Sequence, residues 1–354
     1  MTETALITMF GDALIAPDDS SDREAVRGIV LDRNTPGLLG LSGNHLVYAP
    51  PSFGIVTLRP GVYQLRDQEG AVYSHAPDGT RDQDMERESW SELSCLILRR
   101  FPEIAPSSDD AVPIPRHLHF ICNDIPALDP AFSENITRTA SLNPGWRVHI
   151  WDEATRFQFI SDHYGWDVLK IYLMIGNEYG AAKADFFRYL LIYKLGGVYL
   201  DLKSSMSQPL DAIIHPRDEY LISQWNMSGS GRHAGWGLGA SIAYVTGGEY
   251  QQWFLIARPG HPYLRRVILL VMTKILTYRP DVHGVGAVTT FNITGPHAYT
   301  KAIHAVREDF THRVFDAESA GLIYSTIENH RERSSSTYRQ ARTPLVTGND
   351  SYLL

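Results

Sequence analysis

The sequence predicts an α/β fold, a mostly parallel sheet flanked by helices, preceded by a β-rich N-terminal region. After about residue 113, apolar strand-like runs alternate with helix-like segments. Before about residue 80, short β-type runs are separated by clusters of Gly, Pro and Asp. The chain is 354 residues long and 44% hydrophobic, enough to bury a sizeable core. We therefore expect two regions, residues 1–105 and 113–354.

The residue pattern of the first region, 1–105, predicts a β-rich accessory unit that ends in a helix. Ser89 begins that helix, because a serine followed three residues later by Glu92 matches a capping box. Residues 102–115 hold a Pro-Ser-Ser-Asp-Asp run and read as a linker. The expected short strands are 45–48, 54–58, 61–65 and 71–74.

In the second region, the apolar run 116–122 reads as a buried strand. The segment 180–195 is the clearest helix, and Gly196-Gly197 ends it because glycine readily adopts the left-handed backbone of a helix C-terminus. The other expected elements are a helix at 130–140, a strand at 147–151, helices at 152–164 and 167–174, and a strand at 198–201.

Charge and composition exclude several classes of protein. The formal net charge of −8 argues against nucleic acid as a partner. The longest apolar run, 267–272, is far below the ~18 residues of a membrane span. Two cysteines, Cys95 and Cys122, predict neither a disulfide framework nor a zinc site. Because no basic stretch precedes the first apolar residues, we also expect no secretory signal and a cytoplasmic location.

The most informative stretch is 180–205, which places charged residues within a helix and just after a strand. Asp185 and Arg188 are three residues apart and hence neighbours on one helix face. Asp201 follows a short strand, at the edge where ligands bind in open α/β sheets. Carboxylates accept bonds from sugar hydroxyls or hold a cation, and arginine binds phosphate. The alternative is a surface ion pair and an ordinary turn aspartate.

This stretch resembles glycosyltransferase family 32, described as the glycosyltransferase sugar-binding region containing a DXD motif. It is more distantly similar to the clostridial glucosylating toxins. The pattern is carried by Asp185, Arg188, Gly196, Gly197, Tyr199 and Asp201. Further family landmarks follow in order at 114–121, 143–152, 258–262 and 294–296, so the resemblance covers about residues 113–300.

The resemblance implies a GT-A fold and transfer of a sugar from a nucleotide donor to an acceptor hydroxyl, with retention of anomeric configuration. A UDP-linked donor is expected in preference to a GDP-linked one. The acceptor is left open among a glycan, a lipid-linked glycan, a small molecule and a protein side chain. The apolar runs of the sequence predict no transmembrane segment, and peripheral contact with a membrane stays open.

The resemblance also assigns roles to residues. Asp185 would accept bonds from donor hydroxyls, and Arg188 would contact the donor sugar or the leaving phosphate. Asp201 would be the first acid of the DXD motif and the ligand of Mn²⁺ or Mg²⁺; these three form the expected catalytic set. The expected donor-binding residues are Phe120, Ile121, Cys122, Asp185, Arg188, Tyr199, Asp201 and Lys203.

Lys203 departs from the family, because it stands where the second acid of the motif is expected. Three outcomes stay open. Metal binding at Asp201 is weakened, since hard cations take several oxygen ligands; or the Lys203 ammonium itself neutralises the diphosphate; or the protein is a non-catalytic pseudoenzyme that binds nucleotide sugars or glycans. A metal-dependent hydrolase using Asp185 and Asp201 is a further rival, and it would need more carboxylate or histidine ligands.

Cys122 is the second departure, because relatives place a tryptophan there to stack on the base. Trp151 or Trp146 are candidate substitutes, although a strand tryptophan is more often core. The Gly/Ser-rich segment 223–236 reads either as an acceptor loop or as an ordinary long loop.

Four histidines are further candidates for contact with the diphosphate or with a metal ion. His261 and His297 are weaker candidates for contact with the diphosphate. We expect His117 and His119 to face opposite sides of their strand, which would argue against a shared metal.

Overall fold

The computed structural model describes the main region and a few strands of the N-terminal region. The described residues are 104, 112–227, 233–276, 278–329 and 338–347, with strand residues 6–7, 13–14, 54–59 and 62–66. Near the N-terminus, β1 (Leu6–Ile7) pairs with β2 (Ala13–Leu14), and β3 (Gly54–Arg59) pairs with β4 (Val62–Arg66), both antiparallel. The expected strands at 54–58 and 61–65 are therefore confirmed. Those at 45–48 and 71–74, and the helix from Ser89, lie outside the described residues.

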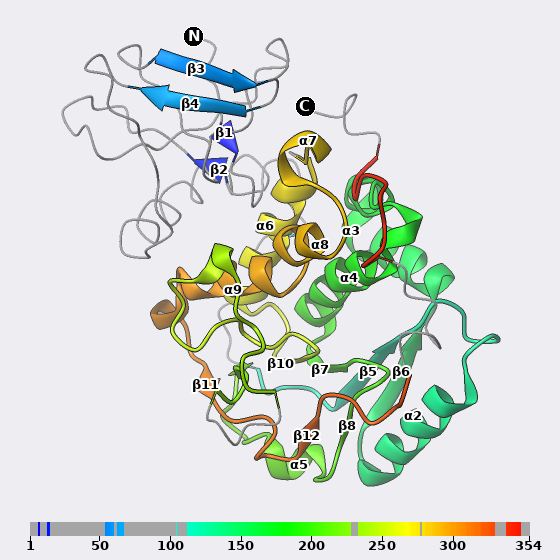
Figure 1. Ribbon diagram of the computed structural model, residues 1–354. Helices are drawn as coiled ribbons and strands as arrows, with labels where there is room; N and C mark the ends of the chain where they lie inside the picture. The colour runs from blue at the N-terminus through cyan, green and yellow to red at the C-terminus, as the bar shows by residue number, and fades with distance from the viewer. Residues whose placement is uncertain are drawn as a thin grey trace.

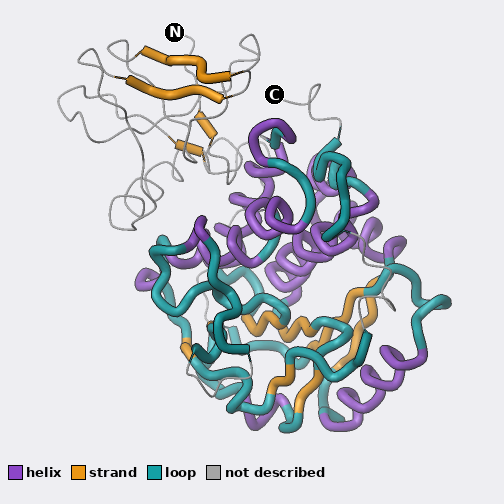
Figure 2. Tube along the Cα trace, in the orientation of Figure 1, coloured by secondary structure: helices purple, strands orange, loops and turns teal. Residues whose placement is uncertain are grey.

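A four-stranded, mostly parallel sheet forms the centre of the main region (Figures 1 and 2). Its order is β10 (Phe254–Ala257), β7 (Gly197–Leu200), β5 (His117–Ile121), β6 (Arg147–Trp151). Strand β5 is parallel to both β6 and β7, whereas β10 runs antiparallel to β7. The chain leaves β5 toward β6 and returns to β7 on the other side, so the connections diverge between β5 and β7. In open α/β sheets such a switch point, at the carboxyl ends of the strands, is where ligands bind.

Helices cover both faces of this sheet (Figure 1). The larger layer contains α3, α4, α6 and α9, and α2 and α5 lie on the opposite face with the small strand pairs. The expected α/β class, with a mostly parallel sheet flanked by helices, is therefore confirmed. The helices are α2 (Pro130–Leu142), α3 (Glu153–Leu173), α4 (Gly180–Leu195), α5 (Leu210–Ile213), α6 (Pro262–Leu276), α7 (Pro280–His283), α8 (Ala287–Ile293) and α9 (Pro296–His304). The remaining strands are β8 (Ser205–Met206), β9 (Leu221–Ile222), β11 (Arg313–Val314) and β12 (Leu322–Ile323).

The expected element boundaries are close to the observed ones. Strand β6 and helix α4 coincide with the expected ranges residue for residue. The two helices expected at 152–164 and 167–174 are the two parts of α3, which is interrupted at Gly165 with φ 78° and ψ 177°. No helix within the described part of the chain is long and apolar enough to cross a membrane.

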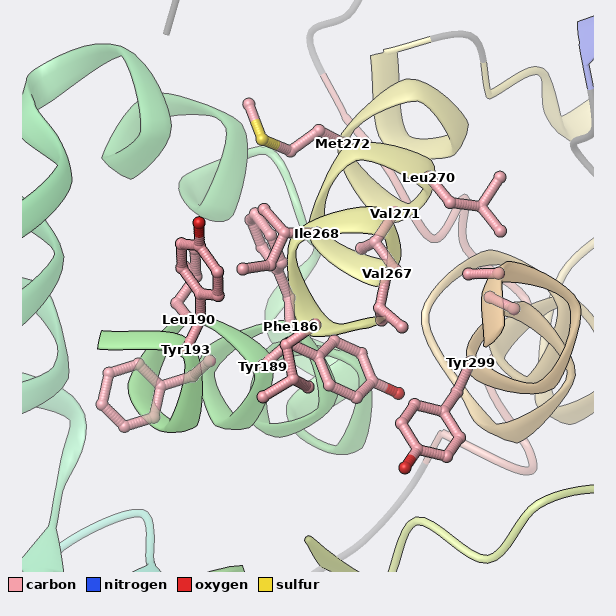
Figure 3. Close-up of a cluster of buried hydrophobic side chains, with 14 of the residues drawn as sticks. Phe186, Tyr189, Leu190, Tyr193, Val267, Ile268, Leu270, Val271, Met272 and Tyr299 are labelled. Carbon is pink, nitrogen blue, oxygen red and sulfur yellow. The ribbon is translucent and has the colours of Figure 1, made fainter. Parts of the chain in front are cut away.

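Helix α4 is the centre of the larger core. Its side chains pack against α6 and α9, as Figure 3 shows for Phe186, Tyr189, Ile268 and Tyr299. Nearly every residue from Ala182 to Tyr193 is buried, so this helix has no solvent face. The apolar run at 267–272 lies in α6, and every one of its residues is at most 2% exposed. A helix buried on all sides gives polar groups on it a fixed position and little contact with water.

The prediction that His117 and His119 face opposite sides is wrong. Residues two apart on a strand point to the same face, and the two rings stack with centroids 5.9 Å apart. Because His119 pairs with His149 across β5 and β6, the rings of these two residues also stack, at 4.9 Å. His117 Nδ1 lies 2.8 Å from His149 Nε2. The sheet therefore carries a column of histidines on the face that α3 and α4 cover.

Candidate active site

The candidate site is built around two charged residues on the buried helix α4. Asp185 is 4% exposed and Arg188 is 6% exposed. Their i, i+3 spacing brings Arg188 Nη2 to 2.9 Å from Asp185 Oδ1. Burying a charge is costly unless it is paired and hydrogen-bonded. The interpretation of this pair as a surface ion pair is therefore excluded by its burial.

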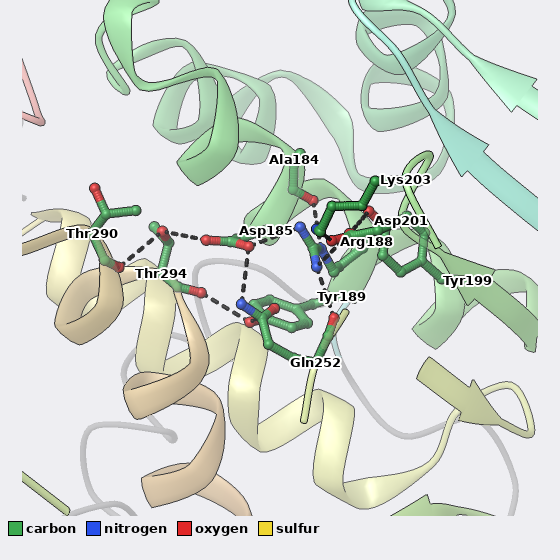
Figure 4. Close-up of polar contacts among 10 residues, drawn as sticks. All are labelled: Ala184, Asp185, Arg188, Tyr189, Tyr199, Asp201, Lys203, Gln252, Thr290 and Thr294. Carbon is green, nitrogen blue, oxygen red and sulfur yellow. Dashed lines mark hydrogen bonds and ion pairs between the residues drawn. The ribbon is translucent and has the colours of Figure 1, made fainter. Parts of the chain in front are cut away.

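Asp185 is held by donors from three different elements (Figure 4). Besides Arg188, Gln252 Nε2 donates to Oδ1 at 3.1 Å and Thr294 Oγ1 donates to Oδ2 at 3.1 Å. Burial raises the pKa of this carboxyl to about 6, against the opposing effects of Arg188 and Gln252. At neutral pH Asp185 is therefore mostly ionised, but it lies close to the range in which it takes up a proton.

Arg188 connects the helix to the end of strand β7. Its Nη1 donates to the carbonyl oxygen of Gln252 at 2.7 Å and lies 3.4 Å from Asp201 Oδ1. Its guanidinium also lies over the Tyr199 ring, 4.6 Å from the centroid. A planar guanidinium stacked on a ring and fixed by carboxylates has a single orientation. The helix and the strand end are thus joined by one side chain.

Asp201 follows β7 directly and is satisfied on both carboxylate oxygens. Tyr199 donates its hydroxyl to Oδ1 at 2.7 Å, and Lys203 Nζ pairs with Oδ2. The side chains of Asp201 and Lys203 are each 15% exposed. The Lys203 charge lowers the pKa of Asp201 against the opposing effect of burial. Asp201 therefore stays an anion, and the expectation of an ordinary turn aspartate does not fit this position.

Four charges thus form a chain in the order Asp185, Arg188, Asp201, Lys203 (Figure 4). The chain is neutral as a whole, with two anions and two cations. The expected catalytic residues are brought together, and so are the expected donor-binding residues Tyr199 and Lys203. Lys203 points toward Asp201 rather than away from it.

The residues present do not fit a divalent cation at Asp201. Such a cation takes six or more oxygen ligands, but Oδ1 and Oδ2 are already bonded to Tyr199, Arg188 and Lys203. Among the residues that the structure describes, no group of three His, Cys, Asp or Glu side chains could hold a metal ion. The assignment of Asp201 as a metal ligand is therefore not supported by its surroundings, and the described part of the chain offers no ligand set for the rival metal-dependent hydrolase.

Gln252, Thr294 and Tyr189 contribute to the site but were not expected from the sequence. Tyr189 Oη lies 2.9 Å from Gln252 Oε1 and 2.9 Å from the carbonyl oxygen of Thr294. The pairing of strands explains the position of Gln252, because β10 is antiparallel to β7 and the residues before β10 lie opposite those after β7. The backbone confirms this pairing, since Asp201 N donates to the carbonyl oxygen of Trp253 at 2.9 Å.

Phe120, Ile121 and Cys122 lie at the carboxyl end of β5, next to the switch point. All three are at most 7% exposed, and Cys122 N donates to the carbonyl oxygen of Trp151. Burial raises the pKa of the Cys122 thiol to about 11, so this residue is not a nucleophile. The expected contact between the backbone of these three residues and the nucleoside of the donor stays a prediction.

Neither tryptophan proposed to replace the family's base-stacking residue is free to do so. The Trp151 indole N–H donates to His119 Nδ1, and its ring is packed among His149, Phe159 and Phe187. Trp146 precedes β6, at the amino end of that strand, and donates to Asp211 Oδ1. Trp146 therefore belongs to the core, and Trp151 is partly buried against it.

The remaining histidine candidates have structural partners. His261 is fully buried between the carbonyl oxygen of Thr311 and the backbone N–H of Tyr263, and burial lowers its pKa to about 3. His297 lies beside Ser241 and Asn292, and burial lowers its pKa to about 4. No contact described for these two histidines reaches Asp185 or Asp201.

Fold and site together define a class, an α/β protein with a chain of buried charges at the switch point of its sheet. Comparison with known proteins confirms the family resemblance. Residues 129–219, which include Asp185, Arg188, Asp201 and Lys203, match the glycosyltransferase sugar-binding region containing a DXD motif.

Several curated relatives are fungal glycosyltransferases. The chain is 31% identical to the putative glycosyltransferase HOC1 of Saccharomyces cerevisiae, over 48% of this chain and 43% of that protein. It is 31% identical to the initiation-specific alpha-1,6-mannosyltransferase of Candida albicans, over 31% of this chain and 29% of that protein. It is 27% identical to inositol phosphoceramide mannosyltransferase 3 of Schizosaccharomyces pombe, over 32% and 30%. The chain thus spans less than half the length of these relatives.

Among solved structures, the PaToxG glycosyltransferase resembles the chain at 14% identity and a TM-score of 0.37. That likeness covers 64% of this chain and 79% of that one.

Proposed function

We propose that this protein is a glycosyltransferase that moves a sugar from a nucleotide-sugar donor to an acceptor hydroxyl, with retention of anomeric configuration. The observation that carries the proposal is the charge chain from Asp185 to Lys203, at the switch point of the sheet and within the segment that matches the family. A neutral chain of fixed charges is suited to a ligand that has hydroxyl groups next to a diphosphate.

Each charged residue has a distinct part in this proposal. Asp185 accepts bonds from donor hydroxyls, and Arg188 and Lys203 stabilise the charge that develops on the departing diphosphate. The bond from the anomeric carbon to the diphosphate breaks, a bond to the acceptor oxygen forms, and the diphosphate takes the acceptor's proton. Tyr199 and Asp201 are positioning residues, because they hold Arg188 and Lys203 in place through the contacts described above.

We further propose that Lys203 supplies the positive charge that a metal ion supplies elsewhere in the family. A second carboxylate and a divalent cation together contribute a net charge of +1, and the single ammonium of Lys203 contributes the same. Burial of this ammonium is offset by Asp201, which raises the pKa of Lys203. The site thus keeps the family's charge balance with fewer groups, and this favours an enzyme over the pseudoenzyme alternative.

The names of the relatives suggest which donors and acceptors to test. Five of the proteins that resemble the chain are named as mannosyltransferases, and three of these names include inositol phosphoceramide. A mannosyl donor is therefore tested beside the UDP-sugars that the sequence favoured, and both glycan and lipid-linked acceptors are included. The cytoplasmic location expected from the sequence stays a proposal.

The experiment is a donor panel with wild-type protein and Asp201→Ala. Nucleotide release from UDP-glucose, UDP-galactose, UDP-N-acetylglucosamine and GDP-mannose is measured with and without acceptor sugars, and donor binding is measured by calorimetry. We expect release from one donor, reduced at least 100-fold in the variant, because Asp201 orients both cations.

Asp162→Ala is the matched control, since Asp162 is an exposed acid on α3 outside the site. It should leave turnover unchanged. Donor binding without any release would support the pseudoenzyme alternative, and a donor panel that neither binds nor turns over would contradict the proposal.

A further inference from the structure

A cluster of aromatic rings extends from the charge chain to the protein surface. Lys203 Nζ lies 4.6 Å from the centroid of the Tyr324 ring. Tyr324 in turn contacts Trp225 at 5.1 Å and Trp236 at 5.7 Å, both edge to face. None of these aromatic residues is used by the donor site. The cluster lies on two loops, one before β10 and one after β12.

Trp236 is the exposed member of this cluster, with 44% of its surface in contact with solvent. It is nevertheless fixed, because its ring contacts Trp225 at 5.5 Å, His233 at 4.8 Å and Tyr324. Leaving a large indole in water forgoes the free energy of burying it. A ring that is held in place and yet exposed is pre-organised to bind the flat apolar face of a ligand.

Polar groups surround the aromatic rings and hold them in position. His233 Nδ1 lies 2.6 Å from Glu318 Oε1, and Trp225 Nε1 donates to Glu249 Oε1 at 2.8 Å. Gly237, with φ +76°, lets the backbone pass so close to Trp225 that an added Cβ would lie 2.5 Å from the indole. The loop before β10 is thus fixed around the rings by contacts within itself and by a contact to Glu318, which precedes β12.

We propose that Trp236 and its neighbours form the subsite for a pyranose ring of the acceptor, which identifies the acceptor as a carbohydrate. A pyranose has an apolar face of C–H groups that stacks on an indole, and hydroxyl groups at its edge that bond to carboxylates and imidazoles. The inference rests on the proposed function, because the subsite lies next to Lys203, where the departing diphosphate is placed.

The chemistry of the patch favours a sugar over a lipid chain. Met227 and Leu238 are also exposed, at 38% and 64%, but the rings that line the path to Lys203 are accompanied by His233, Glu249 and Glu318. Each carboxylate has one protein partner and further lone pairs beside it, and covering those lone pairs with an acyl chain would take them out of water at a cost in free energy. Hydroxyl groups of a sugar can instead donate to them.

The test compares wild type with Trp236→Ala and Trp236→Phe. Acceptor-dependent nucleotide release is measured with methyl pyranosides of glucose, galactose and mannose, beside release without acceptor. We expect Trp236→Ala to raise the KM for the active pyranoside about tenfold, which corresponds to a loss of about 1.4 kcal/mol of stacking free energy. Donor KM and acceptor-independent release should not change, and Trp236→Phe should keep most of the affinity.

Trp166→Ala is the matched control, because Trp166 is an exposed tryptophan on α3 outside the cluster, 63% exposed. An unchanged acceptor KM in Trp236→Ala would overturn the proposal. So would loss of binding to phosphatidylcholine–phosphatidylglycerol vesicles in that variant with no effect on pyranosides. If wild type releases no nucleotide from any donor, the proposed function fails. Saturation-transfer NMR with the pyranosides then still tests the subsite, because a signal lost only in Trp236→Ala supports it and no signal overturns it.

Discussion

The Asp185–Arg188 pair is the best-shielded ion pair described at the site, and its burial decides how it behaves. Two charges taken out of water are stable together only because Gln252, Thr294 and the Gln252 carbonyl satisfy their remaining bonds. Removing one charge would leave the other uncompensated. The pair therefore contributes both to the fold and to the orientation of Arg188.

Asp185→Ala should lower the free energy of unfolding by about 3 kcal/mol, because it removes the oxygens that accept from the buried Arg188, Gln252 and Thr294. Urea denaturation measures this. Glu308→Ala is the control, since Glu308 is 85% exposed in its pair with Arg307 and should cost less than about 1 kcal/mol. Equal losses in the two variants would contradict a special role for the buried pair.

Donor affinity should fall as the pH decreases below about 6, where Asp185 takes up a proton and loses its pairing with Arg188. Calorimetric titrations of the active donor between pH 8 and pH 5 test this. Protonation of Asp185 does not weaken donor binding by unfolding the protein. A carboxyl group whose pKa is higher in the folded state favours the folded state at low pH. An affinity that stays constant down to pH 5 would show that the ionised carboxylate is not needed.

Among the elements of the fold, the histidine column on β5 and β6 links the sheet to the C-terminal end of helix α4 through a hydrogen bond. His119 Nε2 lies 3.2 Å from the carbonyl oxygen of Gly196, and its Nδ1 accepts the Trp151 indole N–H. Both ring nitrogens are used, so the neutral tautomer with hydrogen on Nε2 is the one that fits. Burial, reinforced by the neighbouring His149, lowers the pKa of His119 to about 3.

His119→Gln should make the pH dependence of stability shallower. The unfolded chain protonates this histidine near 6.5, whereas the folded protein does so only near 3. Its contribution to stability is therefore complete above about 6.5 and is lost as the pH falls toward 3. Wild type should lose about 1.4 kcal/mol per pH unit more than the variant between pH 6 and pH 4. Parallel curves from urea denaturation would contradict this.

The turn between α4 and β7 requires glycine for two reasons. Gly197 has φ +94°, and a Cβ there would lie 2.5 Å from the carbonyl oxygen of His117. Gly197→Ala should therefore cost about 3 kcal/mol of stability, from backbone strain plus a clash. Gly165→Ala separates the two effects, since Gly165 has φ +78° with nothing within 4 Å. It should cost less than Gly197→Ala, about 2 kcal/mol in the same denaturation assay, from the backbone strain at φ 78° and ψ 177° alone.

The order of elements could be predicted from the sequence because each has a local signal. Helix α4 is a long apolar segment that ends at two glycines, and β6 follows a turn at Asn143 to Gly145. The partners of Asp185 could not be predicted, since Gln252 and Thr294 lie 67 and 109 residues away in sequence. Only the antiparallel pairing of β10 with β7 brings Gln252 to the site, and a sequence pattern does not specify that pairing.

At the scale of the whole molecule, the site draws on parts of the chain that are far apart. Asp185, Arg188, Asp201 and Lys203 lie within the segment 129–219 that matches the family. Gln252, Thr294 and Tyr324 lie after it, and they hold Asp185 in place or surround Lys203. The family signature thus supplies the charges, while the C-terminal half of the chain sets their environment and forms the aromatic subsite.

Lys203 takes the place of a metal ion in the proposed mechanism. The most direct test is nucleotide release by wild type and Lys203→Asp, each with EDTA and with Mn²⁺, and Lys203→Met serves as the control for loss of the charge alone. We expect wild type to be unaffected by EDTA, Lys203→Met to be inactive in both conditions, and Lys203→Asp to be active only with Mn²⁺. Wild-type turnover that EDTA abolishes and Mn²⁺ restores would contradict the claim.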